Sequence, residues 1–302
     1  MTRREFLIAV PAAAAPAAGE IGFGYGTYGA KTLTTDAALR LIAETGYDGV
    51  ELALMPGWPT EPKLLDAARR KQLRAQLRER RLALPSLLEV LPLLGGAGKR
   101  QENLERLKRA IELGRDLSPG HPPVVETILG GKTAAWDQTK AQMVEELREW
   151  ARVGESTKTV ICFKPHAAHA VHNPERALWL VKQVGSPSIR VIYDYSHLWL
   201  EGSKLADSLK QLLPVSPFIH VKDAAGTPEK HEYLLPGDGQ TDYVEYFRLL
   251  KEYGYRGFVV VEVSAMVHNK AGFDPVATAK LCYSRLAPAI EKAGLKRRKT
   301  PA

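Results

Sequence analysis

Short apolar runs alternate with stretches of helical spacing along almost the whole chain. The runs, which are rich in β-branched residues, lie near residues 21–27, 49–53, 82–87, 123–128, 159–163, 189–193, 218–221 and 258–261. Helical spacing lies near residues 34–45, 62–81, 100–117, 136–155, 174–184, 203–213, 242–253 and 275–292. Apolar strands that alternate with helices are typical of a parallel sheet with covered faces. Eight such units predict a closed (β/α)8 barrel, a single-domain TIM barrel of the α/β class.

An open, doubly wound sheet is the alternative arrangement of the same units. Sheets of that kind that bind dinucleotides carry a glycine-rich loop after their first strand. Here Gly22, Gly24 and Gly26 lie inside the first predicted strand. The sequence therefore favours the barrel and gives no indication of a dinucleotide site.

The two ends of the chain differ in composition from the barrel region. A twin arginine, Arg3 and Arg4, precedes an apolar stretch rich in alanine and proline. This pattern is typical of a twin-arginine export signal, so we expect a signal peptide at 1–20, the barrel at 21–293 and a basic tail at 294–302. The mature protein would then be periplasmic or secreted, and it would be cytoplasmic if the signal interpretation is wrong. No other stretch has the length and hydropathy of a transmembrane helix, so no stable membrane insertion is expected.

The net charge of +8 at pH 7 would suit an anionic partner. Much of the excess lies in the predicted helix at 62–81 and in the C-terminal tail, however, and a basic helix face is usually only solvated. We therefore expect no nucleic-acid partner. The two cysteines, Cys162 and Cys282, lie in a predicted strand and a predicted helix and are expected to be buried free thiols.

Polar side chains mark the carboxyl ends of three of the later predicted strands. These side chains are Asp194, His220 and Glu262. Carboxyl ends of barrel strands converge on one site, so we expect the three groups to face one another. Two carboxylates and an imidazole are suitable ligands for a divalent metal, which can polarise a carbonyl or stabilise an enediolate. The sequence therefore predicts a metal site at these residues.

The fifth predicted strand contributes groups suited to proton transfer. It ends at Lys164, and His166 follows two residues later. Beside a divalent cation the pKa of a buried lysine would fall, and Lys164 could act as a base or form a Schiff base. Without a metal, Asp194 and Glu262 would instead raise its pKa and pair with it. We expect Lys164, His166 and Glu262 to be the catalytic residues.

Further residues near strand ends are candidates for substrate binding. They are Tyr25, Glu51, His197, Trp199 and Lys222. Carboxylate, imidazole and ammonium groups can contact sugar hydroxyls, and an aromatic face can stack on a sugar ring. Each also has a structural interpretation. Glu51 could be a charge paired inside the barrel mouth, and His197 could orient a metal ligand.

At these residues the chain resembles the sugar phosphate isomerase/epimerase superfamily, the xylose isomerase-like TIM barrels. The resemblance rests on five segments, namely Tyr47-Asp48-Gly49-Val50-Glu51-Leu52, Asp194-Tyr195-Ser196-His197, His220-Val221-Lys222-Asp223, Pro236-Gly237-Asp238-Gly239 and the stretch 254–262. It implies a Glu, Asp, His, Glu ligand set for manganese or magnesium, matched here by Asp194, His220 and Glu262. It also implies a carbohydrate isomerase or epimerase that abstracts a proton next to a sugar carbonyl. Lys164 stands where the family has its first glutamate, which favours an isomerase or lyase over a true 3-epimerase.

Other functions stay open beside this one. Lys164 could occupy the metal position in a metal-free sugar-binding barrel, or it could form the Schiff base of a lyase. DNA repair of the AP endonuclease type is less expected, because such sites need histidines on strands two and three and this chain has none before His121. The expected partner is a small sugar or sugar derivative. The sequence does not determine the sugar, the reaction, the metal occupancy or whether the protein forms a homo-oligomer.

Overall fold

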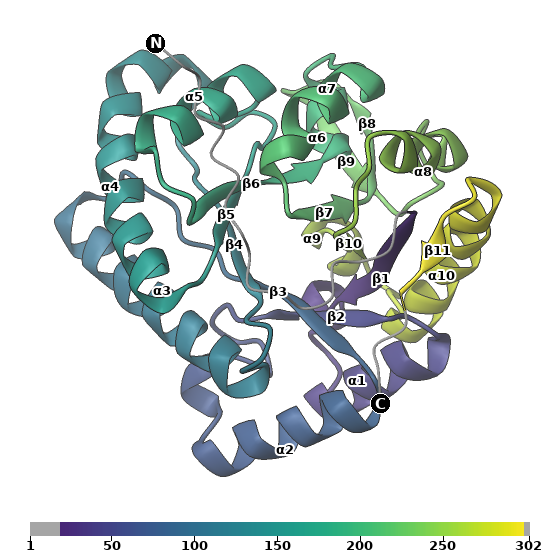
Figure 1. The fold of residues 1–302 in the computed structure, drawn as a ribbon. Helices are drawn as coiled ribbons and strands as arrows, with labels where there is room; N and C mark the ends of the chain where they lie inside the picture. Colours follow the sequence, from purple (N-terminus) through teal and green to yellow (C-terminus); the bar gives the residue numbers. More distant parts are fainter. Residues whose placement is uncertain (1–18, 299–302) are drawn as a thin grey trace.

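The computed structural model describes residues 19–298, and it has the predicted closed barrel (Figure 1). Eight parallel strands form the ring: β1 (Glu20–Gly26), β2 (Gly49–Ala53), β3 (Ala83–Leu88), β4 (Val124–Ile128), β5 (Ile161–Lys164), β6 (Ile189–Asp194), β7 (Phe218–Val221) and β10 (Phe258–Val261). The pairing of β10 with β1 closes the sheet. The fold is therefore a single-domain TIM barrel, and the open doubly wound alternative is wrong.

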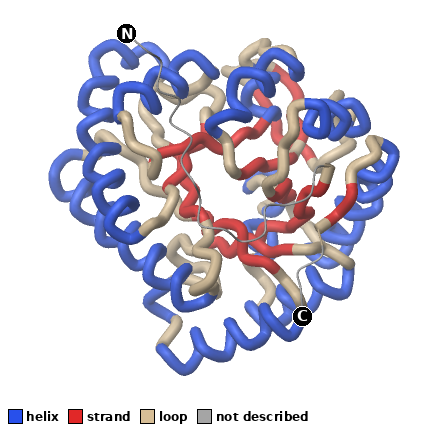
Figure 2. Tube along the Cα trace, in the orientation of Figure 1, coloured by secondary structure: helices blue, strands red, loops and turns tan. Residues whose placement is uncertain are grey.

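The helices surround this ring on the outside, except for the short α9 (Ala265–His268), which lies over the open end of the barrel (Figure 2). The others are α1 (Thr35–Thr45), α2 (Ala67–Glu79), α3 (Gly96–Leu117), α4 (Trp136–Thr157), α5 (Pro174–Val184), α6 (Tyr195–Leu200), α7 (Leu205–Leu212), α8 (Tyr243–Glu252) and α10 (Pro275–Lys292). Their apolar faces pack on the outer face of the barrel and bury the main core. Within residues 19–298, no helix has the length and hydropathy needed to cross a membrane.

Three features differ from the simple eight-unit pattern. After β7 the chain forms an antiparallel hairpin of β8 (Asp223–Gly226) and β9 (His231–Leu234) before the next helix begins. A short helix, α6, starts directly after β6 because the Asp194 side chain accepts a hydrogen bond from the backbone N–H of Ser196. Within the segment expected as a basic tail, β11 (Lys296–Arg297) pairs in parallel with β1. Most of the expected signal peptide lies outside the described residues.

The barrel interior has an apolar layer below a polar layer. Side chains alternate between the two faces of a strand, so residues two apart share a face. Cys162, Ile192, Phe218 and Val260 come from four strands and contact one another as a separate apolar cluster inside the ring. Two residues after each of them, on the same face, stand Lys164, Asp194, His220 and Glu262. The strand period thus places the polar groups above an apolar floor.

The glycines of β1 make room for this interior. A Cβ added at Gly22 would lie 2.3 Å from Cε1 of Phe258, which is far closer than atoms can pack. Gly22 therefore lets the Phe258 ring fill the base of the barrel. Both cysteines are buried free thiols, as predicted.

Candidate active site

The strand ends bring most of the expected site residues together at the carboxyl end of the barrel. In the sheet, Asp194 pairs with His220, and His220 pairs with Val260, two residues before Glu262. Lys164, Asp194 and His220 are at most 3 % exposed. A buried cluster with this much charge is stable only when its members pair with one another. The contacts described next show that they do.

The ammonium group of Lys164 lies at the centre of the cluster. Its Nζ lies 2.7 Å from Oε2 of Glu262, 2.7 Å from Nδ1 of His220 and 3.3 Å from Oδ2 of Asp194. Burial alone would lower the pKa of Lys164, but the negative charges of Glu262, Glu126 and Asp194 outweigh burial and raise the pKa above its ordinary value. Lys164 is therefore an ammonium ion at neutral pH.

A second ammonium group, that of Lys222, lies beside the first. It donates to Oε2 of Glu262 at 2.6 Å, to Oδ2 of Asp194, and to Nε2 of His197 at 3.1 Å. Burial alone would raise the pKa values of Glu262 and Asp194. The charges of the two lysines outweigh burial and lower both pKa values, that of Glu262 by a large amount. Both carboxyl groups are therefore ionised at neutral pH.

His220 is held from its other side by Glu51. Its Nε2 lies 3.0 Å from both carboxylate oxygens of Glu51, and the hydroxyl of Ser86 donates to Oε2 of Glu51 at 2.5 Å. Burial and the charge of Lys164 would lower the pKa of His220, but the negative charges of Glu51, Glu126 and Glu262 outweigh them and raise it to about 10. Glu51 thus orients an imidazole inside the barrel mouth, in agreement with its structural interpretation.

Glu126, in the middle of β4, is the least compensated carboxyl group of the cluster. Its Oε1 lies 3.8 Å from Nδ1 of His220. Burial raises its pKa to about 7, although Lys164 and His220 act in the opposite direction. Glu126 therefore changes its charge near neutral pH. Sequence analysis did not select it, although its place near the carboxyl end of the predicted strand at 123–128 was a signal that could have found it.

Imidazole and phenol rings form one wall of the site. His166 packs against His197, with ring centroids 4.0 Å apart, and Nδ1 of His197 lies 2.7 Å from the hydroxyl of Tyr233. Burial, together with the neighbouring His169, lowers the pKa of His166 to about 3. Burial, with the neighbouring His166, also lowers the pKa of His197 well below its usual value. Both rings are therefore uncharged at neutral pH.

These groups open into a cavity of about 250 Å³. Lys164, Lys222, Glu262 and Glu126 line it, together with His166, His197, Tyr233 and Tyr28. The volume is slightly below the range of about 300–1,000 Å³ that is usual for sites of drug-sized ligands, so the cavity suits a ligand of monosaccharide size. Tyr233 was missed by sequence analysis because the β8–β9 hairpin that carries it is not part of the repeating strand and helix pattern.

Two expected substrate-binding residues lie elsewhere. Tyr25 packs against Tyr47 in the outer core between barrel and helices, with ring centroids 5.3 Å apart. The glycines of β1 take the inward positions, so the alternation of the strand turns Tyr25 outward. Trp199 packs against the small cluster of Ala167, Leu200, Ala224 and Tyr233 and does not line the cavity. The structure therefore places neither Tyr25 nor Trp199 at the cavity.

Two groups of described residues have ligand atoms within 4.8 Å of one another and could hold a metal ion, namely Glu51, Glu126 and His220, and Asp194, His220 and Glu262. The second is the set expected from sequence. Nζ of Lys164 contacts all three of its members, at the place where a shared cation would lie. The donor atoms suit a metal, but with Lys164 in this position the set does not fit one.

Comparison with known proteins agrees with this architecture. The family model described as xylose isomerase-like TIM barrel matches residues 39–280. Fructoselysine 3-epimerase of Shigella flexneri is 24% identical over 260 residues, which cover 82% of this chain and 91% of that protein. Inosose dehydratase of Geobacillus kaustophilus is 22% identical over 289 residues, covering 84% and 85%. By their names, these relatives are an epimerase and a dehydratase.

A solved structure, described as the IOLI protein with a binding zinc atom, has the same fold. The two structures superpose with a TM-score of 0.73 at 18% sequence identity, and the match covers 90% of this chain and 98% of the other. The family match spans most of the chain and all eight barrel strands except the first. The chain therefore belongs to the xylose isomerase-like TIM barrel family.

Proposed function

We propose that this protein is an enzyme that isomerises a sugar derivative, or eliminates a group from it, by abstracting a proton next to a carbonyl. The observation that carries the proposal is that one cavity is lined by an ionised carboxylate, Glu262, an ammonium, Lys164, and an uncharged imidazole, His166. The names of the epimerase and dehydratase relatives support the same class of substrate.

In this proposal Glu262 accepts the proton from carbon, and its carboxyl group then gives that proton to the neighbouring carbon in an isomerisation or to the leaving hydroxyl group in an elimination. It is ionised at neutral pH, as a base must be before the reaction. Removal of the proton places negative charge on the former carbonyl oxygen. A positive charge already fixed nearby stabilises that oxygen without reorganisation, and Lys164 is a buried cation at the same cavity.

His166 is suited to a substrate hydroxyl. Its Nδ1 lies 3.0 Å from the backbone oxygen of Ala167, to which it donates, so its Nε2 carries a free lone pair. Burial keeps the ring uncharged. We propose that Nε2 accepts the hydrogen of the hydroxyl next to the reacting carbon, and that His197 and Lys222 help to orient the sugar.

An isomerase or lyase fits these residues better than a 3-epimerase does. Epimerisation removes a proton from one face of a carbon and returns one to the other face, so it needs two proton-transfer groups. Lys164, at the strand-five position, has a raised pKa and neither accepts a proton nor releases one readily. For the same reason it is a poor Schiff-base nucleophile, since that role needs the neutral amine.

Manganese or magnesium held by Asp194, His220 and Glu262 is the alternative source of positive charge that the sequence predicts. Such an ion would act as a Lewis acid toward the carbonyl oxygen. It would require Lys164 to leave its present contacts with these residues. We therefore assign no step of the proposed reaction to a metal.

The proposal is tested by incubating the protein with a panel of keto-sugars, oxidised glycosides and inososes. Proton NMR follows isomerisation, and ultraviolet absorbance follows the conjugated carbonyl formed by elimination. We expect one substrate class to be converted by the wild type and left unchanged by Glu262→Gln. Sugars that protect the protein against thermal unfolding without being converted would contradict the proposal and indicate a sugar-binding barrel.

A further inference from the structure

The contacts of Lys164 have the pattern of a bound cation. Its Nζ lies within 3.3 Å of one atom from each of Asp194, His220 and Glu262, and these three atoms are the ones that would bind a metal. Mg²⁺ binds its ligands at about 2.0–2.1 Å. An ion at that distance from all three atoms would overlap Nζ, so ammonium and metal exclude each other.

The charges of the cluster also balance without a metal. Asp194 and Glu262 carry two negative charges, and Lys164 and Lys222 carry two positive ones. Each lysine contacts both carboxylates. A divalent ion bound by the two carboxylates would bring the same positive charge, so the two lysines already supply the charge that such an ion would bring to Asp194 and Glu262. All four side chains are buried, so solvent screens their interactions little.

The neighbouring residues support the same arrangement. Glu51 and Ser86 fix the ring of His220 so that Nδ1 faces Lys164 rather than open space. His197 accepts from Lys222 through Nε2 and is held at Nδ1 by Tyr233. In a metal site, such residues would orient the metal ligands. Here they orient the side chains that contact the two ammonium groups.

We propose that Lys164 and Lys222 take the place of a divalent metal, so that the wild-type protein binds no metal ion at Asp194, His220 and Glu262. Lys164 occupies the cation position at the end of β5, and Lys222, directly after β7, completes the charge. This inference deepens the proposed function by naming the source of positive charge. Metal content is measured without substrate, so failure of this inference is distinguishable from failure of the proposed reaction.

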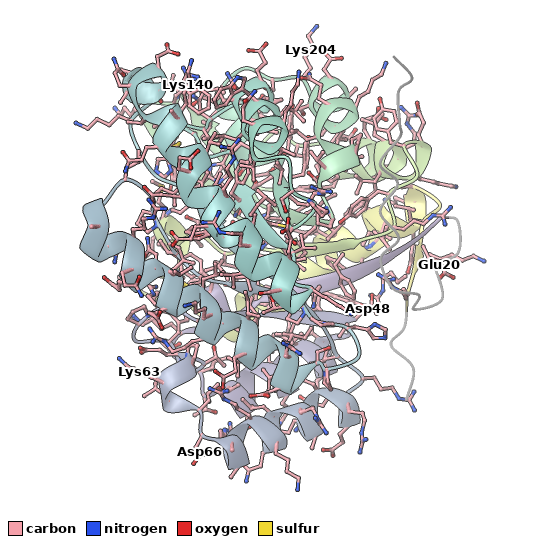
Figure 3. All side chains as sticks on the ribbon, turned by 60° about the vertical axis from the view of Figure 1, so that its left-hand side comes forward. Glu20, Asp48, Lys63, Asp66, Lys140 and Lys204 are labelled. Carbon is pink, nitrogen blue, oxygen red and sulfur yellow. The ribbon has the colours of Figure 1, made fainter. Side chains whose placement is uncertain are left out.

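The test is a titration with Mn²⁺, followed by the electron paramagnetic resonance signal of the free ion, together with elemental analysis of the purified protein. Three proteins are compared: the wild type, Lys164→Glu, and Lys204→Glu as a control. Lys204 is exposed and projects from the surface (Figure 3), so its substitution makes the same change in net charge away from the site. We expect stoichiometric Mn²⁺ binding, with a rise in melting temperature, for Lys164→Glu only.

Two results would overturn the inference. One is stoichiometric Mn²⁺ binding by the wild type that is lost in Asp194→Asn. The other is a folded Lys164→Glu protein that binds no more Mn²⁺ than the control. If far-UV circular dichroism shows that Lys164→Glu does not fold, the titrations of the wild type and of Asp194→Asn still decide. Absence of Mn²⁺ binding by the wild type then supports the inference.

Discussion

Replacing Lys164 by methionine removes the central charge of the site and nearly keeps the length of the side chain. The Lys164 side chain is 2% exposed and contacts Glu262 and Asp194. Removing one partner from a buried ion pair costs about 3–5 kcal/mol, because the other partner is left uncompensated. Lys222 remains and neutralises part of the charge, so we expect a loss at the lower end, about 3 kcal/mol at pH 7. The loss should shrink as the pH falls, because protonation of the two carboxylates relieves their repulsion.

The assay is urea unfolding at pH 7 and pH 5, followed by far-UV circular dichroism and by the fluorescence of the five tryptophans, of which Trp150 is almost completely buried. Lys204→Met, at an exposed site, is the control and should change the free energy of unfolding little. The double variant Lys164→Met with Glu262→Gln should lose less than the sum of the two single variants, since each removes the other's partner. A loss below about 1 kcal/mol for Lys164→Met, typical of an exposed ion pair, would refute the reasoning.

Two further predictions concern other charged residues of the structure. Burial raises the pKa of Glu126 in the folded protein to about 7, whereas its pKa in the unfolded chain is 4.5. The folded protein should therefore lose stability as the pH rises from 4.5 through 7. At 1.36 kcal/mol per pKa unit, the loss amounts to roughly 3 kcal/mol. Glu126→Gln should remove this dependence of stability on pH. If the melting temperatures of variant and wild type shift equally between pH 5 and pH 8, the prediction is contradicted. Asp223 accepts hydrogen bonds from the backbone N–H groups of Gly237 and Gly239, at 2.8 and 3.0 Å, and from the Tyr243 hydroxyl. Asp223→Ala should therefore lower stability by about 3 kcal/mol and speed amide hydrogen exchange at Gly237 and Gly239, whereas unchanged exchange there would show that Asp223 does not hold the loop.

The sequence predicted the barrel because its signals are local and repeated. Strand runs, helical spacing and caps each act over a few residues, as at Thr34, which caps α1, and Gly46, which ends it in a left-handed conformation. Convergence of Asp194, His220 and Glu262 followed from the barrel itself. The β8–β9 hairpin could not be predicted in this way, because it is an insertion that does not follow the repeating strand and helix pattern.

The orientation of side chains was harder to predict than their place in the chain. Tyr25 was assigned to the site because it lies at a strand end, but the inward glycines of β1 show that it faces outward. The state of Lys164 could not be settled from sequence either. Its pKa depends on how many carboxylates surround it, and the contribution of Glu126 becomes evident only when the strands are placed side by side.

The most direct test of the proposed reaction is solvent exchange at carbon. The protein is incubated in D₂O with the substrate identified from the panel, and NMR follows deuterium at the carbon next to the carbonyl. The account predicts incorporation or loss of hydrogen at that carbon with the wild type, and none above background with Glu262→Gln. Conversion of the substrate without breaking that carbon–hydrogen bond, or an unchanged rate in Glu262→Gln, would contradict it.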